Sequence, residues 1–326
     1  MTAALDLTSS RPARFSRAII LTVDRTYLPY ALFVIGQIAA LHPKRDFDFC
    51  IVTTDDLPHH PLIDLHDVRI VRAGLDSVVR AFSVGDRIPV ATYFRLFLAG
   101  ALGGDYARIL YLDADIYIRR GDFARLLGAP MGAHPVAGAR DPVQFRHKGY
   151  VSADMKGLGL GHFPYLSSGV QLIDTARYNA LQIGPRAIAL ATQSPDKMKV
   201  LDQTAINAVL QGDFAELPPG WNWLYGFRTI YFTELYDPPI LHFAGWRKPW
   251  SHLNGEFPER YSRDYRAFFA EHFPDQHAKM PPFTPHGAAR LRHLRFFLKH
   301  IAGMGVTFAA MEQFKDDFDI KITSPH

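Results

Sequence analysis

The sequence predicts an α/β protein built on a mostly parallel sheet with helices on both faces. Two observations lead to this fold class. Short apolar runs, typical of strands covered on both sides, alternate with helical patterns. The chain is also long enough for a large core, with 326 residues of which 48% are hydrophobic and 21% charged. The predicted strands of the first half are residues 18–23, 48–54, 68–73 and 108–112.

Two helical segments lie between these strands. Residues 27–41 predict a helix, because four apolar residues recur at helical spacing and share one face, namely Leu28, Leu32, Ile35 and Ala39. Residues 90–102, "VATYFRLFLAGAL", predict a second helix that ends at Gly103-Gly104. Strands that alternate with helices favour parallel pairing through crossover helices.

The second half has a more mixed pattern. Residues 165–174 are typical of a turn followed by a strand, and residues 201–211 of a helix. Residues 238–250 predict a strand that runs into a Gly/Pro loop. Residues 254–286 are rich in Pro, His and aromatic side chains, and we expect them to wrap the core irregularly.

Residues 288–303, "AARLRHLRFFLKHIAG", predict an amphipathic helix. Its apolar stripe consists of Leu291, Leu294, Phe297, Leu298 and Ile301. Its basic stripe consists of Arg292, Arg295 and Lys299. Such a helix either docks on the body of the protein or lies on an anionic membrane face, and the pattern leaves both open.

Bulk composition narrows the class of protein. The net charge of +4 is too small to indicate a nucleic-acid partner, but it suits an anionic ligand or surface. Cys50 is the only cysteine, so no intrachain disulfide can form, and its apolar surroundings predict a buried thiol. Residues 1–17 lack the apolar region of a signal peptide, and no apolar stretch is long enough to span a membrane. We therefore expect a cytoplasmic protein, with peripheral contact at the inner membrane face through residues 288–303.

The stretch "RILYLDADIY" (108–117) ends a predicted strand with two carboxylates, Asp113 and Asp115. Two like charges this close are unfavourable unless a cation lies between them. Hard cations such as Mg²⁺ and Mn²⁺ prefer oxygen ligands, and ligands of open α/β sheets bind beyond the carboxyl ends of the strands. A solvated turn is the alternative. A haloacid-dehalogenase-like phosphatase fits less well, because that family expects Thr where Tyr117 stands.

At this point a family resemblance emerges. The chain resembles glycosyltransferase family 8, which includes glycogenin and the bacterial lipopolysaccharide α-galactosyl- and α-glucosyltransferases. The resemblance covers roughly residues 18–260 and rests on the order of several motifs, which is more specific than any one of them. These motifs are "TVDRTYLPY" (22–30), "TYFRLFL" (92–98), "YLDADIYI" (111–118), "GARDPVQFRHKGY" (138–150), "YLSSGVQLID" (165–174), "LDQTAIN" (201–207) and "LHFAGWRKPW" (241–250).

The resemblance implies a GT-A-type, Rossmann-like fold and a division of the chain. Residues 18–260 would form the catalytic domain that binds a nucleotide sugar. Residues 1–17 would be a flexible N-terminus, and residues 261–326 a C-terminal wrap with the basic helix.

The resemblance also implies contacts to the donor. Asp24, Thr26 and Tyr27 would hold uridine, although the family often has Asn in place of Thr26. Arg95 would point at the nucleotide sugar or orient the metal carboxylates. Asp141 would face the transferred sugar, and a turn-forming Asp-Pro is the alternative for it.

Four residues would surround the transferred sugar. Ser167 and Ser168 stand in the family's "Asn-Ala-Gly" segment, so a shorter hydroxyl replaces an amide that contacts sugar. Asp202 and Gln203 would lie beside the anomeric carbon and the sugar hydroxyls. An acidic cap at a helix N-terminus is the alternative for Asp202.

The last motif implies the remaining metal ligand. His242 would complete the site of Asp113 and Asp115, and two carboxylates with one imidazole suit Mn²⁺ best, with Mg²⁺ as the alternative. Gly245 would let the backbone approach a diphosphate, and Lys248 would give it a point charge.

The implied reaction is the transfer of a hexose, with retention, from UDP-glucose or UDP-galactose to a hydroxyl of a glycan or lipid-linked acceptor. Asp202, Gln203 and Lys248 would act in catalysis, and front-face attack is favoured because Gln203 is a poor nucleophile. A non-catalytic nucleotide-sugar sensor or scaffold is the rival, and Ser167 is the feature that favours it. A nucleotidyltransferase fits less well, since no Gly-rich phosphate loop follows the first strand. Aromatic residues of "GWNW" (220–223) would form either a sugar-stacking rim or core.

Overall fold

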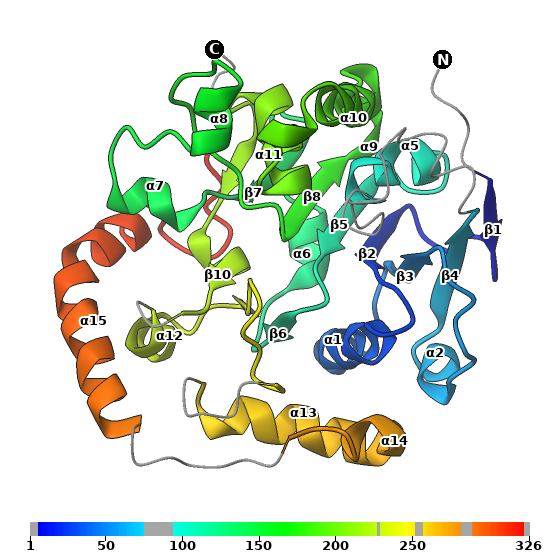
Figure 1. The fold of residues 1–326 in the computed structure, drawn as a ribbon. Coiled ribbons are helices and arrows are strands. Elements are labelled where there is room, and N and C mark those ends of the chain that lie inside the picture. Colours follow the sequence, from blue (N-terminus) through cyan, green and yellow to red (C-terminus); the bar gives the residue numbers. More distant parts are fainter. Residues whose placement is uncertain (1–5, 75–93, 227–228, 252–256, 282–288, 323–326) are drawn as a thin grey trace.

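The computed structural model describes residues 6–74, 94–226, 229–251, 257–281 and 289–322, with the backbone alone for 289–293 (Figure 1). Its centre is an eight-stranded sheet in the order β1-β4-β3-β2-β5-β8-β7-β9. The strands are β1 (Leu7–Ser9), β2 (Arg17–Thr22), β3 (Asp48–Thr53), β4 (Val68–Ala73), β5 (Arg108–Leu112), β7 (Val136–Ala139), β8 (Val170–Asp174) and β9 (Ala215–Leu217).

Parallel pairing dominates this sheet. β4, β3, β2 and β5 pair in parallel, as do β7 and β9, whereas β8 is antiparallel to both of its neighbours and β1 is antiparallel to β4. The predicted α/β class with a mostly parallel sheet is confirmed. Because β2, β3, β4 and β5 run the same way, their carboxyl ends share one edge, where ligands of such sheets bind.

Both faces of the sheet are covered, as the apolar runs predict. In β2, Ile19 and Leu21 pack into one core cluster, whereas Ala18 and Ile20 pack into another on the opposite face. Cys50, on β3, is fully buried, and burial raises the pKa of its thiol to about 12. The predicted buried thiol is therefore confirmed.

Helices pack on each side of the sheet, as Figure 1 shows. One side carries α1 (Leu28–Leu41), α2 (Pro61–Leu65) and α6 (Phe123–Leu127). The other carries η1 (Phe94–Leu96), α5 (Leu98–Leu102), α9 (Thr175–Ala180), α10 (Ile183–Gln193), η2 (Pro195–Lys197) and α11 (Leu201–Leu210). Two short helices, α7 (Pro142–Arg146) and α8 (Ala153–Gly157), follow β7.

A small second sheet continues the chain beyond β5. Its order is β10-β11-β6, formed by β10 (Trp223–Leu224), β11 (Ile240–His242) and β6 (Ile116–Ile118). The helices around it are η3 (Pro219–Asn222), α12 (Ile230–Tyr236), α13 (Glu259–His272), α14 (Pro274–His277) and α15 (Ala289–Met311). Aromatic side chains dominate the core between this sheet and α13.

Three segments differ from the expectation. Of residues 1–17, Leu7–Ser9 form the edge strand β1 rather than a flexible segment, and residues 1–5 lie outside the described part. The helix expected at 90–102 is a 3-10 turn followed by the short helix α5, and residues 90–93 lie outside the described part. Residues 259–272 form the regular helix α13 rather than an irregular wrap, because Tyr261, Tyr265 and Phe269 recur at helical spacing and are buried.

The C-terminal helix α15 is longer than expected and ends at Met311 instead of residue 303. Among the described residues, no helix combines the length and apolar character needed to cross a bilayer.

Candidate active site

Two carboxylates follow the end of β5, at the ligand-binding edge of the main sheet. Asp113 and Asp115 lie between β5, which ends at Leu112, and β6, which begins at Ile116. β6 pairs antiparallel with β11, and the register places His242 opposite Ile116. The small sheet therefore brings a residue far away in sequence beside the acidic pair.

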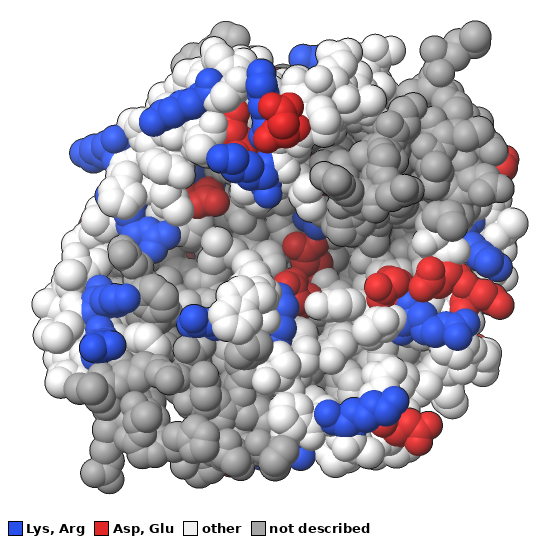
Figure 2. Space-filling model, in the orientation of Figure 1, with Lys and Arg blue, Asp and Glu red and all other residues white. Residues whose placement is uncertain are grey.

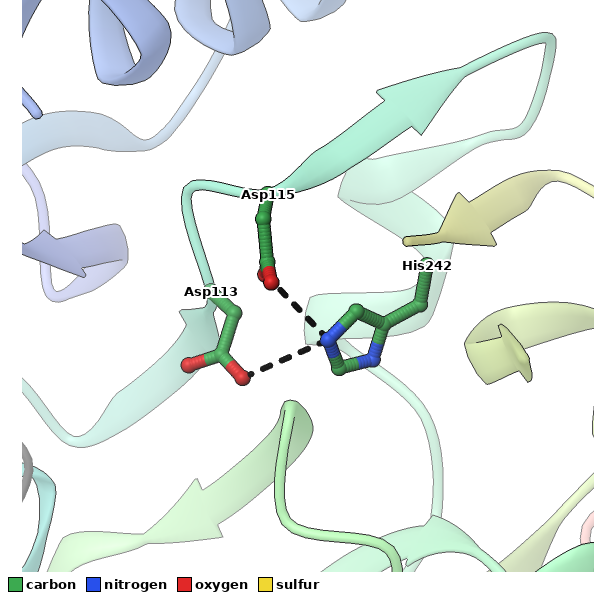
Figure 3. A group of neighbouring side chains, drawn as sticks. All are labelled: Asp113, Asp115 and His242. Carbon is green, nitrogen blue, oxygen red and sulfur yellow. Dashed lines mark ion pairs between the residues drawn. The ribbon is translucent and has the colours of Figure 1, made fainter. Parts of the chain in front are cut away.

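Figure 3 shows that Nε2 of His242 faces both carboxylates. It lies 3.2 Å from Oδ1 of Asp115 and 3.6 Å from Oδ2 of Asp113. One ligand atom from each of the three residues falls within 4.8 Å of the others. This donor set, two oxygens and one imidazole nitrogen at one point, fits a single Mn²⁺ or Mg²⁺ ion.

Lys248 contacts one of these two carboxylates, that of Asp115. Its ammonium group donates to Asp115 and to the main-chain oxygen of Phe243, and its side chain is buried. Burial would raise the pKa of Asp115, but the His242 imidazole and the Lys248 ammonium outweigh burial and hold that pKa below its usual value. The Asp115 carboxylate therefore favours its ionised form.

Arg95 connects Asp113 of the acidic pair to a third acidic residue of the site, Asp202. Its guanidinium is 2.9 Å from Asp113 and 3.0 Å from Asp202, and it lies 4.6 Å from the centre of the Tyr111 ring. Burial alone would lower the pKa of Arg95, but the two carboxylates raise it. The Tyr111 hydroxyl donates to Asp113 at 2.5 Å, so Tyr111 is a site residue that sequence reasoning missed.

Asp202 is the second residue of α11 and follows a residue with an unusual backbone conformation. The preceding residue, Leu201, has a φ of +44°, a left-handed conformation that costs a non-glycine residue roughly 1 kcal/mol. Asp202 itself is 4% exposed, and burial raises the pKa of its carboxyl to about 6, although Arg95 opposes the rise. Locally strained backbone and a buried acid are typical of functional sites.

Gln203, Ser168 and Arg95 form one connected group. Oε1 of Gln203 accepts from the main-chain N–H of Ser168 at 3.0 Å and lies 3.2 Å from its hydroxyl. Arg95 donates to the main-chain oxygen of Ser168 at 2.9 Å. The structure therefore brings together Arg95, Asp113, Asp115, Ser168, Asp202, Gln203, His242 and Lys248, all of which were predicted as site residues.

Two residues behind the predicted metal ligands also escaped sequence reasoning. Asn222, buried at the end of η3, accepts from Nδ1 of His242 at 2.8 Å and donates to Ser167. Gly169 precedes β8, and a Cβ there would lie 2.2 Å from Cε1 of His242 and 2.8 Å from Oδ2 of Asp113. The site has no room for a side chain at position 169.

Asp141 caps a short helix, and it also lines a cavity next to Gln203. It caps α7 by accepting from the N–H of Val143 at 2.8 Å, which agrees with a turn-forming Asp-Pro. Asp141 also lines a cavity of about 110 Å³ together with Gln203, Tyr150 and Phe163. Burial raises the pKa of its carboxyl.

The predicted uridine residues lie on the loop before α1. Asp24 accepts from the main-chain N–H of Tyr27 at 2.8 Å, while Asp24 and Thr26 are exposed. Burial and the neighbouring Asp115 and Asp24 carboxylates raise the pKa of Tyr27.

Gly245 and Trp246 form an open loop between His242 and Lys248. Gly245 has a φ of +85°, which favours glycine, and nothing lies near the position that a Cβ would take there. Trp246 is 71% exposed and stacks with Arg247. By contrast, Trp221 and Trp223 are buried in the core, so the "GWNW" segment is not a sugar-stacking rim.

Charged side chains of both signs gather on the face drawn in Figure 2. Acidic side chains lie at its centre and also toward its top and right, with basic side chains among them. An anionic donor bound with a cation would meet charge of both signs there.

Comparison with known proteins agrees with this geometry. The family description of Glycosyl transferase family 8 matches residues 18–254. Glycosyltransferase GlyF of Streptococcus pneumoniae serotype 4 (strain ATCC BAA-334 / TIGR4) is 25% identical over 247 residues, which cover 72% of this chain and 57% of that protein. Lipopolysaccharide 1,2-glucosyltransferase of Escherichia coli (strain K12) is 29% identical over 175 residues, 49% of each chain. The chain thus spans about half the length of these relatives.

Solved structures share the fold. A galactosyltransferase LgtC complex with donor and acceptor sugar analogs superposes with a TM-score of 0.60 at 20% identity, covering 77% of this chain and 95% of that one. The bifunctional glycosyltransferase WbbM gives a TM-score of 0.65 at 17% identity, covering 82% and 52%. The predicted GT-A-type fold is therefore confirmed. With a family match over most of its length and with the acidic pair, the histidine and the lysine of the motifs converging at one sheet edge, the chain belongs to glycosyl transferase family 8.

Proposed function

We propose that this protein is a metal-dependent, retaining hexosyltransferase that moves glucose or galactose from a UDP-sugar to a hydroxyl of a glycan or glycolipid. The observation that carries the proposal is the convergence of Asp113, Asp115 and His242 on one point, with Lys248 and Arg95 beside them. The two carboxylates and the imidazole suit a divalent ion. The positively charged side chains of Lys248 and Arg95 beside them suit a diphosphate bound together with that ion.

The residues divide the work between the two ends of the donor. Asp113, Asp115 and His242 would hold the ion, Mn²⁺ or Mg²⁺, which neutralises charge on the departing diphosphate when bound. Lys248 gives that diphosphate a fixed positive charge, so that the leaving UDP is stabilised as its charge develops. Arg95, Asp202 and Gln203 bind the hexose hydroxyls, and Asp24, Thr26 and Tyr27 hold the uracil and ribose.

The site favours front-face attack. Asp202 is ion-paired with Arg95, which weakens it as a nucleophile, and Gln203 accepts two contacts from Ser168. In the proposed step the bond between the anomeric carbon and the phosphate oxygen breaks, and its electron pair leaves with UDP. The acceptor oxygen forms its new bond on the same face, and its proton passes to the departing phosphate oxygen.

The acceptor is a sugar hydroxyl that approaches over the loop of Gly245 and Trp246. An exposed tryptophan beside the diphosphate site presents a flat apolar face, which is the surface that sugar rings stack on. The relatives include a lipopolysaccharide glucosyltransferase, and we place this protein in lipopolysaccharide or cell-surface polysaccharide synthesis on that ground.

Helix α15 supports an acceptor carried by a membrane. Four of its apolar side chains, Leu294, Phe297, Leu298 and Ile301, are each more than half exposed. A smaller set of its side chains contacts the body of the protein. His300 accepts from the main-chain N–H of Tyr231 at 3.0 Å, and Phe296 is buried. The helix therefore docks on the body, but these four apolar side chains remain largely exposed.

The charge of α15 supports an anionic surface as the partner of these exposed apolar side chains. Residues 289–311 contain four basic side chains and no acidic one, and Arg295 and Lys299 lie exposed beside the stripe. An apolar stripe flanked by cations suits the face of an anionic bilayer. We therefore propose peripheral binding to anionic lipid through α15, at the inner face of the membrane.

The test of the activity is metal-dependent release of UDP. Purified protein is incubated with UDP-glucose or UDP-galactose in Mn²⁺, in Mg²⁺ and in EDTA, with and without glycan acceptors, and UDP is measured. We expect slow release without acceptor, faster release with one, and none in EDTA. Tight binding of the nucleotide sugar without release, across a broad acceptor panel, would instead support the sensor or scaffold alternative.

A further inference from the structure

A hydrogen-bonded relay lies behind the metal-ligand cluster and begins at a main-chain carbonyl. Asn222 is 2% exposed and ends η3. Its amide nitrogen donates to the main-chain oxygen of Ser167 at 3.2 Å and to the Ser167 hydroxyl at 3.1 Å. Its amide oxygen lies 2.8 Å from Nδ1 of His242. The relay thus joins the segment before β8 to the predicted metal ligand on β11.

The chemistry of the Ser167 carbonyl fixes the direction of this relay. A carbonyl oxygen only accepts hydrogen bonds, so the group of Asn222 that faces it must be the NH₂. The amide oxygen of Asn222 is therefore turned toward His242. Because this oxygen can only accept a hydrogen bond, Nδ1 of His242 must carry the hydrogen. Nε2, which faces Asp113 and Asp115 in Figure 3, is then the nitrogen whose lone pair is left for a cation.

We propose that Asn222 is a positioning residue of the metal centre: it holds His242 in the Nδ1–H form, with Nε2 directed at the cation, and the Ser167 carbonyl holds the amide. The inference rests on the divalent-ion site of the proposed function. Partners on the far nitrogen of a histidine ligand set its tautomer and orientation, and their loss typically weakens metal affinity by roughly 10–100-fold.

The relay also gives position 167 a task apart from the sugar. Both oxygens of Ser167 accept from Asn222, and its side chain is buried. The hydroxyl that replaces the family's asparagine thus supports the metal ligand from behind.

The test measures metal binding directly. The Mn²⁺ dissociation constant is obtained by electron paramagnetic resonance, and spin-echo modulation from a coordinated ¹⁴N nucleus reports whether His242 is bound to the ion. Asn222→Leu and the smaller Asn222→Ala remove the acceptor of the Nδ1 hydrogen, whereas Asn222→Asp keeps one. Asn207→Leu is the matched control, because Asn207 is fully buried and its amide is bonded on both sides to Leu166.

We expect Asn222→Leu and Asn222→Ala to weaken Mn²⁺ binding by roughly 10–100-fold and to lose the nitrogen modulation. Asn222→Asp should stay within a few-fold of the parent and keep that modulation, as should Asn207→Leu. Unchanged modulation in Asn222→Leu and Asn222→Ala, or equal losses in Asn222→Asp or Asn207→Leu, would overturn the proposal. If the parent protein binds no Mn²⁺, the divalent-ion site itself is wrong, and the two failures are thereby told apart.

Discussion

At the scale of single residues, Gly169 occupies a position where the site has no room for a side chain. A Cβ there would overlap the His242 ring and crowd the Asp113 carboxylate, and the backbone cannot retreat easily because its carbonyl accepts from the N–H of Asp113 at 2.9 Å. Gly169→Ala should therefore displace these two proposed metal ligands and weaken Mn²⁺ binding by at least about tenfold.

The control for this prediction is Gly104→Ala, because nothing lies near a Cβ at position 104. Titration of both variants with Mn²⁺, followed by electron paramagnetic resonance, gives the affinities, and circular dichroism checks that both fold. Parental Mn²⁺ affinity in Gly169→Ala would show that the ligands adapt, contrary to the expectation.

Asp202 predicts a pH dependence of stability. Burial raises the pKa of its carboxyl from 3.8 to about 6, so the folded protein holds this proton more tightly than the unfolded chain. The resulting stabilisation is complete below the unfolded pKa and is lost as pH rises through the folded one, between about 4 and 6. The loss amounts to at most ~3 kcal/mol of unfolding free energy.

Denaturant unfolding in EDTA at several pH values tests this sign, with Asp202→Asn as the reference. The stability of the parent relative to Asp202→Asn should fall as pH rises from about 4.5 to 7, while shared carboxylates cancel in the difference. A difference that stays flat or rises over this range would contradict the raised pKa.

The roles of residues could be predicted where a family motif specifies the side chain. They were harder to predict where only the packing of the folded chain brings a residue to the site. Asp113, Asp115, His242 and Lys248 converge as predicted. Tyr111 and Asn222 reach the site from a strand and a 3-10 turn whose apolar surroundings look like core, so spacing alone gives no signal for them.

At the scale of elements, α15 carries the prediction. If its outward stripe binds anionic lipid, Leu298→Ser with Ile301→Ser should weaken binding to phosphatidylglycerol vesicles. Each half-exposed apolar side chain contributes about 1 kcal/mol on burial, so the double variant should bind roughly tenfold or more weakly. Because both side chains face solvent, thermal stability should change little.

Vesicle co-sedimentation gives this comparison, with phosphatidylcholine vesicles to isolate the contribution of charge. The matched control replaces two exposed leucines elsewhere, Leu65→Ser with Leu181→Ser. Equal sedimentation of the two double variants would rule out the stripe as the contact. A dimer in analytical ultracentrifugation that only the α15 variant dissociates would instead identify the stripe as an interface between two copies.

The elements also show which patterns the sequence carries well. β2, β3 and β5 were predictable because each contains a run of apolar residues buried on both faces, and β4 because apolar residues still predominate around its two arginines. The prediction of an irregular segment over 254–286 was wrong for α13, because it followed the Pro, His and aromatic content and not the helical spacing of Tyr261, Tyr265 and Phe269.

At the scale of the whole molecule, the site lies where the two sheets meet. The main sheet supplies Asp113 and Asp115 at the end of β5, and the small sheet supplies His242 from β11. The alternation of strands and helices predicted that the acidic pair would lie at the carboxyl end of a strand of the main sheet. The antiparallel insertion of β8 and the small sheet depend on pairings between segments far apart in sequence, which local patterns do not reveal.

Because a bound cation would join both sheets, ligand binding should stabilise the whole fold. A ligand at a hundredfold excess over its dissociation constant adds about 2.7 kcal/mol to the unfolding free energy. UDP alone would face the two carboxylates of the acidic pair without a cation between them, so UDP with Mn²⁺ should raise the melting temperature by several degrees and UDP with EDTA by much less. Asp115→Asn should lose the Mn²⁺-dependent part. Asp46→Asn should keep it, because Asp46 pairs with Arg17 at the start of β2, at the opposite edge of the sheet. Differential scanning fluorimetry measures each shift within one variant, and equal shifts by UDP in Mn²⁺ and in EDTA would mean that nucleotide binds without the cation, so that the acidic pair serves another purpose.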